Sequence, residues 1–160
     1  EGTPIKRKFK EIYASEFLYD ENGIAVWPKL AVNYTAKTQF LFRINKGVLD
    51  ISQNNKLNEY VPDHARRVPF SHMIYIGDGL TDVPCMKLVK LNGGKSIAVY
   101  QPRKRKKVTP LLQDKRVDFI AEANYSEGSE LESIVQEIIV KVAACNILVQ
   151  RHAKQIGSIK

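Results

Sequence analysis

A chain of 160 residues, 44% of them hydrophobic, is long enough to bury a core, which indicates a globular protein and argues against a disordered one. No apolar run approaches the ~20 residues of a membrane helix, and the start of the chain, EGTPIKRKFK, has no apolar segment of signal-peptide type. We therefore expect a single soluble, cytoplasmic domain with no membrane partner. Cys85 and Cys145 are too few for a disulfide framework and are expected to be reduced thiols.

The net charge of +8, from 25 basic and 17 acidic residues, raises the question of a polyanionic partner. Basic side chains gather in residues 103–107, RKRKK, and in a second group near the start of the chain, Lys6, Arg7, Lys8 and Lys10. A run of this length is more often a solvated surface than a binding site. We do not expect nucleic acid as a partner, and a nucleic-acid-binding module that uses residues 103–107 remains the alternative.

The first part of the chain predicts short strands. Residues 9–14 are expected to form one strand, and residues 16–27 two more, joined by a turn at Asn22 and Gly23. The Asn-Gly pair is typical of tight hairpins. This hairpin would be an excursion beside the main sheet.

The next segment predicts a helix that begins after Thr35, a suitable N-cap, and ends before Gly47. Its apolar face would comprise Phe40, Leu41, Ile44 and Val48. Lys37 then lies in the first turn, at the positive end of the helix dipole, which is mildly unfavourable unless an anion lies in front of it. Lys46 lies at the negative end, where helix electrostatics alone explain it. Residues 50–71 follow as a long irregular connection.

The stretch MIYIGDGLTDVPCM, residues 73–86, carries the clearest chemical signal. An apolar run that ends at a glycine predicts a buried strand closed by a sharp turn. Asp78 follows at the strand's carboxyl end, and Asp82 lies where Pro84 suits the first turn of a helix. Open α/β sheets bind ligands beyond the carboxyl ends of their strands, and Mg²⁺ accepts one or two carboxylates there together with phosphate oxygens. The pattern predicts a magnesium site, unless Asp82 is only an N-cap and Asp78 only a turn former.

The rest of the chain predicts a helix over residues 83–90, strands over 96–100 and 117–121, and a final amphipathic helix. Ser129 and Glu132 form the sequence of a capping box at the start of this last helix. Its core-facing stripe would be Leu131, Ile134, Val135, Ile138, Val142 and Cys145. These residues need no functional explanation.

Two other patterns do not lead to a site. The letters GGKS at residues 93–96 are not a nucleotide-binding P-loop, because Val89 stands where the first glycine is required and a strand follows. Cys85 lacks a histidine placed to activate it, so we expect a small buried side chain rather than a nucleophile.

The acidic stretch GDGLTDVPCM resembles the GDGxxD motif of the haloacid dehalogenase-like (HAD) superfamily, and its surroundings resemble the phosphoserine-phosphatase-like branch. The resemblance covers residues 9–148 and includes SIAVY after the motif and DFIAEANYSEGS before the last helix. It implies an α/β fold with a Rossmann-like parallel sheet and flanking helices.

The resemblance also implies a magnesium-dependent phosphohydrolase that cleaves a small phosphorylated substrate, a phosphate monoester, through an aspartyl-phosphate. Asp78 and Asp82 would hold Mg²⁺, and Lys37, with Lys46 as its rival, would neutralise the phosphate. The family's nucleophilic motif, DxDx(T/V), is absent from this sequence. We therefore expect residues 1–160 to be the carboxyl-terminal part of a single HAD-like domain, inactive without the missing amino-terminal part. A catalytically silent interaction protein with the same fold stays open as an alternative.

Overall fold

The computed structural model describes residues 5–158 and divides into two compact units, Glu1–Val68 and Pro69–Lys160. Their boundary falls in the predicted irregular connection, which contains only α2 (Asn54–Asn58) and the short 3₁₀ turns Asp63–Ala65 and Phe70–His72.

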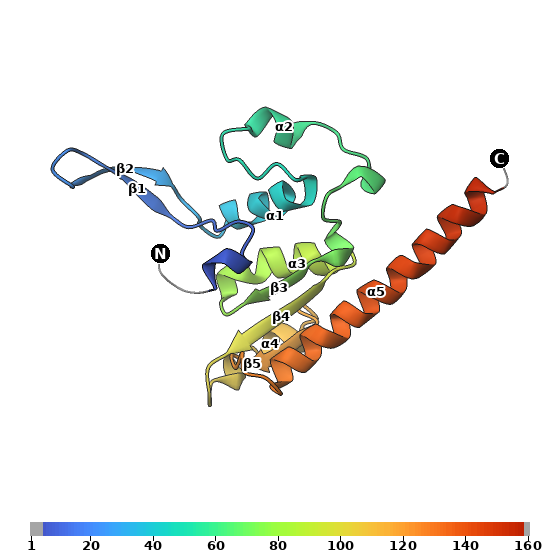
Figure 1. The fold of residues 1–160 in the computed structure, drawn as a ribbon. Helices are drawn as coiled ribbons and strands as arrows, with labels where there is room; N and C mark the ends of the chain where they lie inside the picture. Colours follow the sequence, from blue (N-terminus) through green and yellow to red (C-terminus); the bar gives the residue numbers. More distant parts are fainter. Residues whose placement is uncertain (1–4, 159–160) are drawn as a thin grey trace. The chain divides into compact units, whose positions relative to one another are not determined.

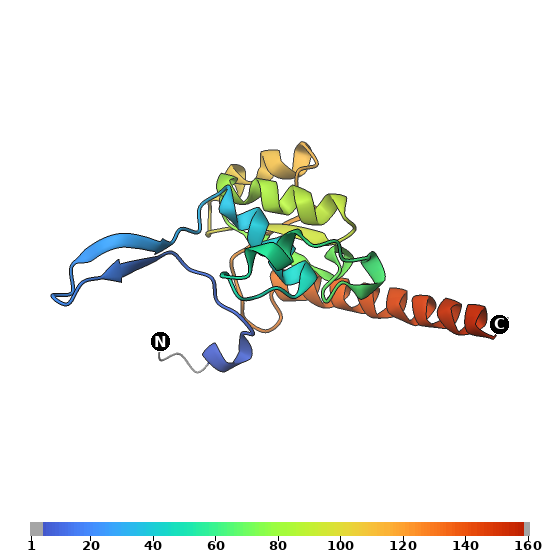
Figure 2. The ribbon, with the colours of Figure 1, turned by 90° about the horizontal axis from the view of Figure 1, so that it is seen from above.

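The amino-terminal unit contains an antiparallel hairpin of β1 (Glu16–Tyr19) and β2 (Ala25–Leu30), as predicted. Gly23 closes its turn with a φ of 76°, which favours glycine. Figures 1 and 2 show the hairpin reaching away from α1 (Ala36–Lys46) of the same unit.

The predicted strand over residues 9–14 is wrong: this segment, described throughout, forms no strand. The Tyr13 side chain connects this segment to the rest of the amino-terminal unit. The Tyr13 hydroxyl donates to the Leu49 carbonyl at 2.9 Å, and its ring packs on Phe40 with ring centroids 4.6 Å apart. The Tyr13 side chain thus contributes to holding a segment that has no ladder of strand hydrogen bonds.

Helix α1 has the predicted bounds, but its start is capped differently. The Asn33 side-chain oxygen, rather than that of Thr35, accepts from the Thr35 and Ala36 backbone N–H groups at 3.1 and 2.9 Å. Gly47 ends the helix in the left-handed region with a φ of 77°. In the predicted apolar face, Phe40 and Leu41 are buried, and Ile44 and Val48 are half-buried.

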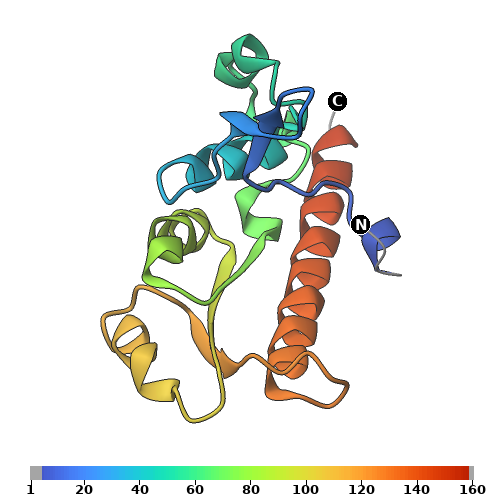
Figure 3. The ribbon, with the colours of Figure 1, turned by 90° about the vertical axis from the view of Figure 1, so that its left-hand side faces the viewer.

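The carboxyl-terminal unit is a parallel three-stranded sheet in the order β3 (Ile74–Gly77), β4 (Lys95–Tyr100) and β5 (Phe119–Glu122). Helices α3 (Val83–Leu91) and α4 (Thr109–Gln113) lie on one face of the sheet, and α5 (Glu130–Gly157) lies on the other (Figure 3). The predicted α/β architecture with a parallel sheet and flanking helices is confirmed at this level.

The alternation of side chains along β4 explains the two layers of helices, because successive strand residues face opposite sides of a sheet. Ile97 and Val99 pack with Leu131 and Ile138 of α5. Ala98, between them, packs on the other face in a buried cluster with Val83, Met86, Val108, Leu111, Val117 and Ile120. The central strand is thus buried on both faces, as is typical of parallel sheets.

Strand β3 is less buried than its sequence predicts, and Ile76 is 38% exposed. Within residues 5–158, β3 pairs with β4 on one side, and no strand pairs with its other side. An edge strand lacks a neighbour to cover its side chains, which accounts for the difference.

Helix α5 confirms the predicted amphipathic helix, with two corrections. Ser129 Oγ accepts from Glu132 N at 3.2 Å, but the Glu132 carboxylate accepts from Gly128 N at 2.6 Å, so only half of the predicted capping box forms. Cys145 is exposed rather than buried, because the packing of α5 on the sheet reaches only to Val142. No helix within the described residues is long and apolar enough to cross a membrane.

Candidate functional site

Asp78 lies where the sequence places it, directly after β3 at the carboxyl end of the parallel sheet. Its side chain is exposed and borders two hollows of about 200 and 320 Å³. Both hollows are also lined by Val99, Tyr100 and Gln101 at the end of the neighbouring strand β4. The carboxylate therefore faces the part of the sheet at which α/β proteins bind ligands.

Asp82 lies on the following 3₁₀ turn (Leu80–Asp82) and is 5% exposed. One of its carboxylate oxygens accepts from the Tyr75 hydroxyl at 2.8 Å, and the other accepts from Gly79 N at 3.3 Å. The hydrogen bond to Gly79 closes the turn that follows Asp78. The simpler interpretation predicted that the Asp82 side chain caps α3, but it makes no such hydrogen bond. Its side chain instead fixes the loop between β3 and α3.

Gly77 makes this arrangement possible for a steric reason. A Cβ atom at residue 77 would lie 2.7 Å from Asp82 Cβ and 2.9 Å from Asp82 Oδ2. Contacts this close are not tolerated without movement, so the side chain of Asp82 folds across the strand end only because residue 77 is glycine. At Gly79 the nearest atom would lie 3.5 Å away, which is ordinary contact.

Tyr75 is the site residue that sequence reasoning missed. Its burial, and then its hydrogen bond to Asp82, raise the pKa of its hydroxyl, so that Tyr75 remains a protonated donor. Tyr75 and Gly77 alternate with Ile76 along β3, and this period-two spacing on one face was the signal available in the sequence.

The acidic loop carries both carboxylates that the sequence predicts as magnesium ligands, Asp78 and Asp82. Among residues 5–158, no group of three or more His, Cys, Asp or Glu side chains is placed to hold a metal ion. Mg²⁺ nevertheless needs only one or two carboxylates when water and substrate oxygens complete its shell. Asp78 is exposed, whereas the Asp82 carboxylate is buried and already accepts from Tyr75 and Gly79. Asp78 therefore fits a direct ligand, and Asp82 a secondary one.

Two lysines of the basic run also border this site. Lys104 and Lys107 line the 200 Å³ hollow together with Asp78. The Lys104 ammonium donates to the Gln101 side-chain oxygen at 2.6 Å. The run is exposed, as predicted, but the sequence did not show that part of it returns to the carboxyl end of the sheet.

Lys37 and Lys46 belong to the amino-terminal unit. Lys37 lies in the first turn of α1, as predicted. The Lys46 ammonium donates to the Leu57 and Glu59 carbonyls at 2.7 and 2.6 Å, at the carboxyl end of α2. Lys46 therefore has a structural role in holding α2.

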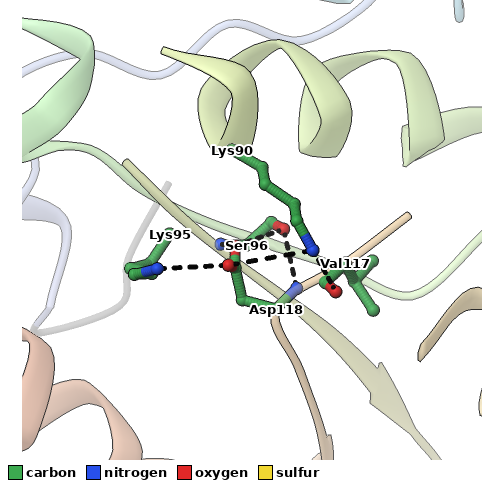
Figure 4. Close-up of polar contacts among 5 residues, drawn as sticks. All are labelled: Lys90, Lys95, Ser96, Val117 and Asp118. Atoms are coloured by element: carbon green, nitrogen blue, oxygen red, sulfur yellow. Dashed lines mark hydrogen bonds and ion pairs between the residues drawn. The ribbon is translucent and has the colours of Figure 1, made fainter. Parts of the chain in front are cut away.

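A second polar cluster lies at the amino ends of β4 and β5, away from Asp78 (Figure 4). The Asp118 carboxylate accepts from Ser96 N at 2.9 Å, from Ser96 Oγ at 3.1 Å and from the Lys95 ammonium at 3.2 Å. Lys90 donates to the Val117 carbonyl at 2.8 Å. The lysine and serine of GGKS thus fix the register of two strands, which agrees with the rejection of a P-loop.

Comparisons with known proteins leave the family of the chain open. No protein-family model and no solved structure matches the chain. An uncharacterized protein of Borreliella burgdorferi is 35% identical over 155 residues, which cover 86% of this chain and 52% of the relative. The chain thus spans about half the length of this curated relative.

Proposed function

We propose that the protein is a magnesium-dependent phosphohydrolase of the HAD-like kind, which hydrolyses phosphate monoesters of a small substrate. This chain would supply the half of the site that holds the metal and stabilises the phosphate. The observation that carries the proposal is the position of Asp78, an exposed aspartate that borders two hollows at the carboxyl end of a parallel sheet. The resemblance of GDGLTDVPCM to the GDGxxD motif supports the same function.

Asp78, with Asp82 as a second ligand, would hold Mg²⁺. The bound ion would neutralise the phosphate oxygens on which negative charge increases during phosphoryl transfer. The roles of Tyr75 and Gly79 are to hold the Asp82 carboxylate through its two hydrogen bonds, and thereby to keep the loop that carries Asp78 in one conformation. Pre-organised groups stabilise a transition state without reorganisation at the moment of reaction.

The nucleophile would come from outside this sequence, which has no DxDx(T/V) motif. Strand β3 has an edge that no strand within residues 5–158 occupies. The backbone groups on such an edge are suited to pairing with a further strand. We place the strand that carries the nucleophilic aspartate there, beside Asp78, in a HAD-like core to which this chain contributes the carboxyl-terminal part. A relative about twice as long as the matched region is compatible with such a larger protein.

Lys37 is proposed as the cation that neutralises the transferred phosphate. Its place in the first turn of α1 supports this role, because backbone N–H groups and the helix dipole there favour an anion. Lys46, in the last turn at the negative end of the helix dipole, is the weaker candidate.

Phosphate release from an aryl phosphate by the complete protein tests the proposal. Asp78→Asn should abolish magnesium-dependent turnover, whereas Asp114→Asn, at an exposed aspartate of the same unit, should leave it unchanged. Residues 1–160 alone should show no turnover, because covalent catalysis and the positioning of the nucleophile are both absent. Metal-dependent turnover by residues 1–160 that Asp78→Asn abolishes would place the nucleophile within this chain and overturn the proposed division.

A further inference from the structure

We propose that the hollow lined by Lys104 and Lys107 binds a second anionic group of the substrate, so that the protein acts on small bisphosphorylated molecules in preference to monophosphorylated ones. This inference rests on the proposed function, because it names the substrate class of the same site. It assigns a role to part of the basic run, which the core of the unit does not use.

The lining of the hollow is divided between opposite charges. The hollow is lined by one acidic residue, Asp78, by two basic residues, Lys104 and Lys107, and by Gln101; the remaining lining residues are Val99, Tyr100 and Val108. A single phosphate near Asp78 would be repelled by the carboxylate unless a cation lay between them. A second phosphate at the lysines needs no such cation, because lysine is a common phosphate ligand. The lining therefore complements a molecule that presents one anion on each side.

The backbone holds Lys104 at the hollow. Lys104 N donates to the Gln101 carbonyl at 2.9 Å, which closes a turn with Pro102 and Arg103 at its centre. Arg103 adopts a φ of 64°, in the left-handed region that favours glycine. This conformation is unfavourable for a non-glycine residue, and the third residue of a type II turn requires it. Val108, 4% exposed in the core, anchors the other end of the lysine-bearing segment.

One hydrogen bond does not exhaust the Lys104 ammonium. Its contact with the Gln101 oxygen uses one of its three N–H donors. Two donors of the ammonium group are therefore left for an anion. The Lys107 side chain is exposed as well.

The size of the hollow favours a small substituent over a nucleic acid. Its volume of about 200 Å³ lies below the ~300–1,000 Å³ of pockets that enclose a drug-sized ligand. A nucleic acid strand would instead spread over the whole run 103–107, including the basic residues that do not line the hollow. The co-lining of lysines and Asp78 is therefore better explained by a second phosphate on a small substrate.

Calorimetric titration of the complete protein tests this inference with butane-1,4-diol bisphosphate and butyl phosphate as probes, each with and without Mg²⁺. The bisphosphate should bind roughly tenfold more tightly than the monophosphate, as expected from one additional charged contact. The variant Lys104→Gln/Lys107→Gln should lose this preference. The matched variant Lys141→Gln/Lys154→Gln, with the same charge change on exposed residues of α5, should keep it. Equal urea midpoints verify that both variants fold.

Equal affinities for the two probes in the unmodified protein would overturn the inference, and so would equal losses in the two double variants. Tighter binding of a single-stranded oligonucleotide, with a steep salt dependence that requires Lys104 and Lys107, would also overturn it and assign the lysines to nucleic acid. A lysine-dependent preference for the bisphosphate in the absence of Mg²⁺ would stand even if aryl phosphate turnover were not found. The two proposals can therefore fail separately.

Discussion

The Tyr75 hydroxyl donates a hydrogen bond of 2.8 Å to Asp82 Oδ1, and so connects the middle of β3 to the turn that follows the strand. Asp78 lies between these two residues in the chain. Asp82 also accepts from Gly79 N. It therefore makes hydrogen bonds both to the strand before Asp78 and to the residue directly after it. The buried Asp82 thus fixes the loop that carries the exposed Asp78.

Replacing Tyr75 by phenylalanine should destabilise the protein by about 1–3 kcal/mol, because the buried Asp82 carboxylate would lose a hydrogen-bond donor. Urea unfolding at neutral pH measures the change. Tyr125→Phe is the matched control, since Tyr125 is 71% exposed and also borders one of the two hollows. Similar losses in both variants would mean that the contact with Asp82 contributes nothing specific.

Gly77→Ala should destabilise the protein by about 1–3 kcal/mol, as expected for overpacking. The added methyl group would lie 2.7 Å from Asp82 Cβ and would displace the Asp82 side chain. Gly79→Ala should cost clearly less, because its methyl group would meet its nearest neighbour at 3.5 Å and the φ of −136° suits alanine. Thermal or urea unfolding of the two variants gives the comparison, and the reverse order would show that the loop does not depend on space at residue 77.

Much of the fold was readable from the sequence. The strands of the parallel sheet, Pro84 in the first turn of α3 and Ser129 at the start of α5 are local signals that lie at or close to their predicted places, whereas the strand predicted over residues 9–14 does not form. The position of Asp78 also followed from local rules, because a strand that ends at a glycine brings the next residue to the sheet edge.

The positions of the Asp82, Lys104 and Cys145 side chains depend on tertiary contacts, which local sequence patterns do not predict. The buried position of the Asp82 carboxylate requires the absence of a side chain at Gly77 and a hydrogen bond from the Tyr75 hydroxyl. The approach of Lys104 to the hollow depends on a left-handed residue, Arg103, that sequence rules assign to glycine or asparagine. The exposure of Cys145 reflects where the sheet beneath α5 ends rather than the helical period of the residues.

Lys46→Ala should mainly lower the stability of the protein, whereas Lys37→Ala should mainly lower its turnover. Removing the Lys46 ammonium breaks two hydrogen bonds to the carbonyls of Leu57 and Glu59 and should lower stability by about 1 kcal/mol, with little effect on the reaction. Removing the Lys37 ammonium should raise the barrier of the proposed reaction by ~3 kcal/mol, as for other single electrostatic groups. Urea unfolding and kcat/KM of the complete protein separate the two effects. A larger kinetic loss for Lys46→Ala would move the phosphate-neutralising role to Lys46.

Calorimetric titration of Mg²⁺ into the complete protein tests most directly whether Asp78 holds a divalent cation. Asp78→Asn removes the charge of the exposed carboxylate without changing its size, and should weaken binding by roughly tenfold or more. Asp114→Asn, which makes the same change at another exposed aspartate of the unit, should leave the affinity unchanged. Equal affinities in Asp78→Asn and the unmodified protein would remove the metal from this loop, and with it the proposed chemistry of the site.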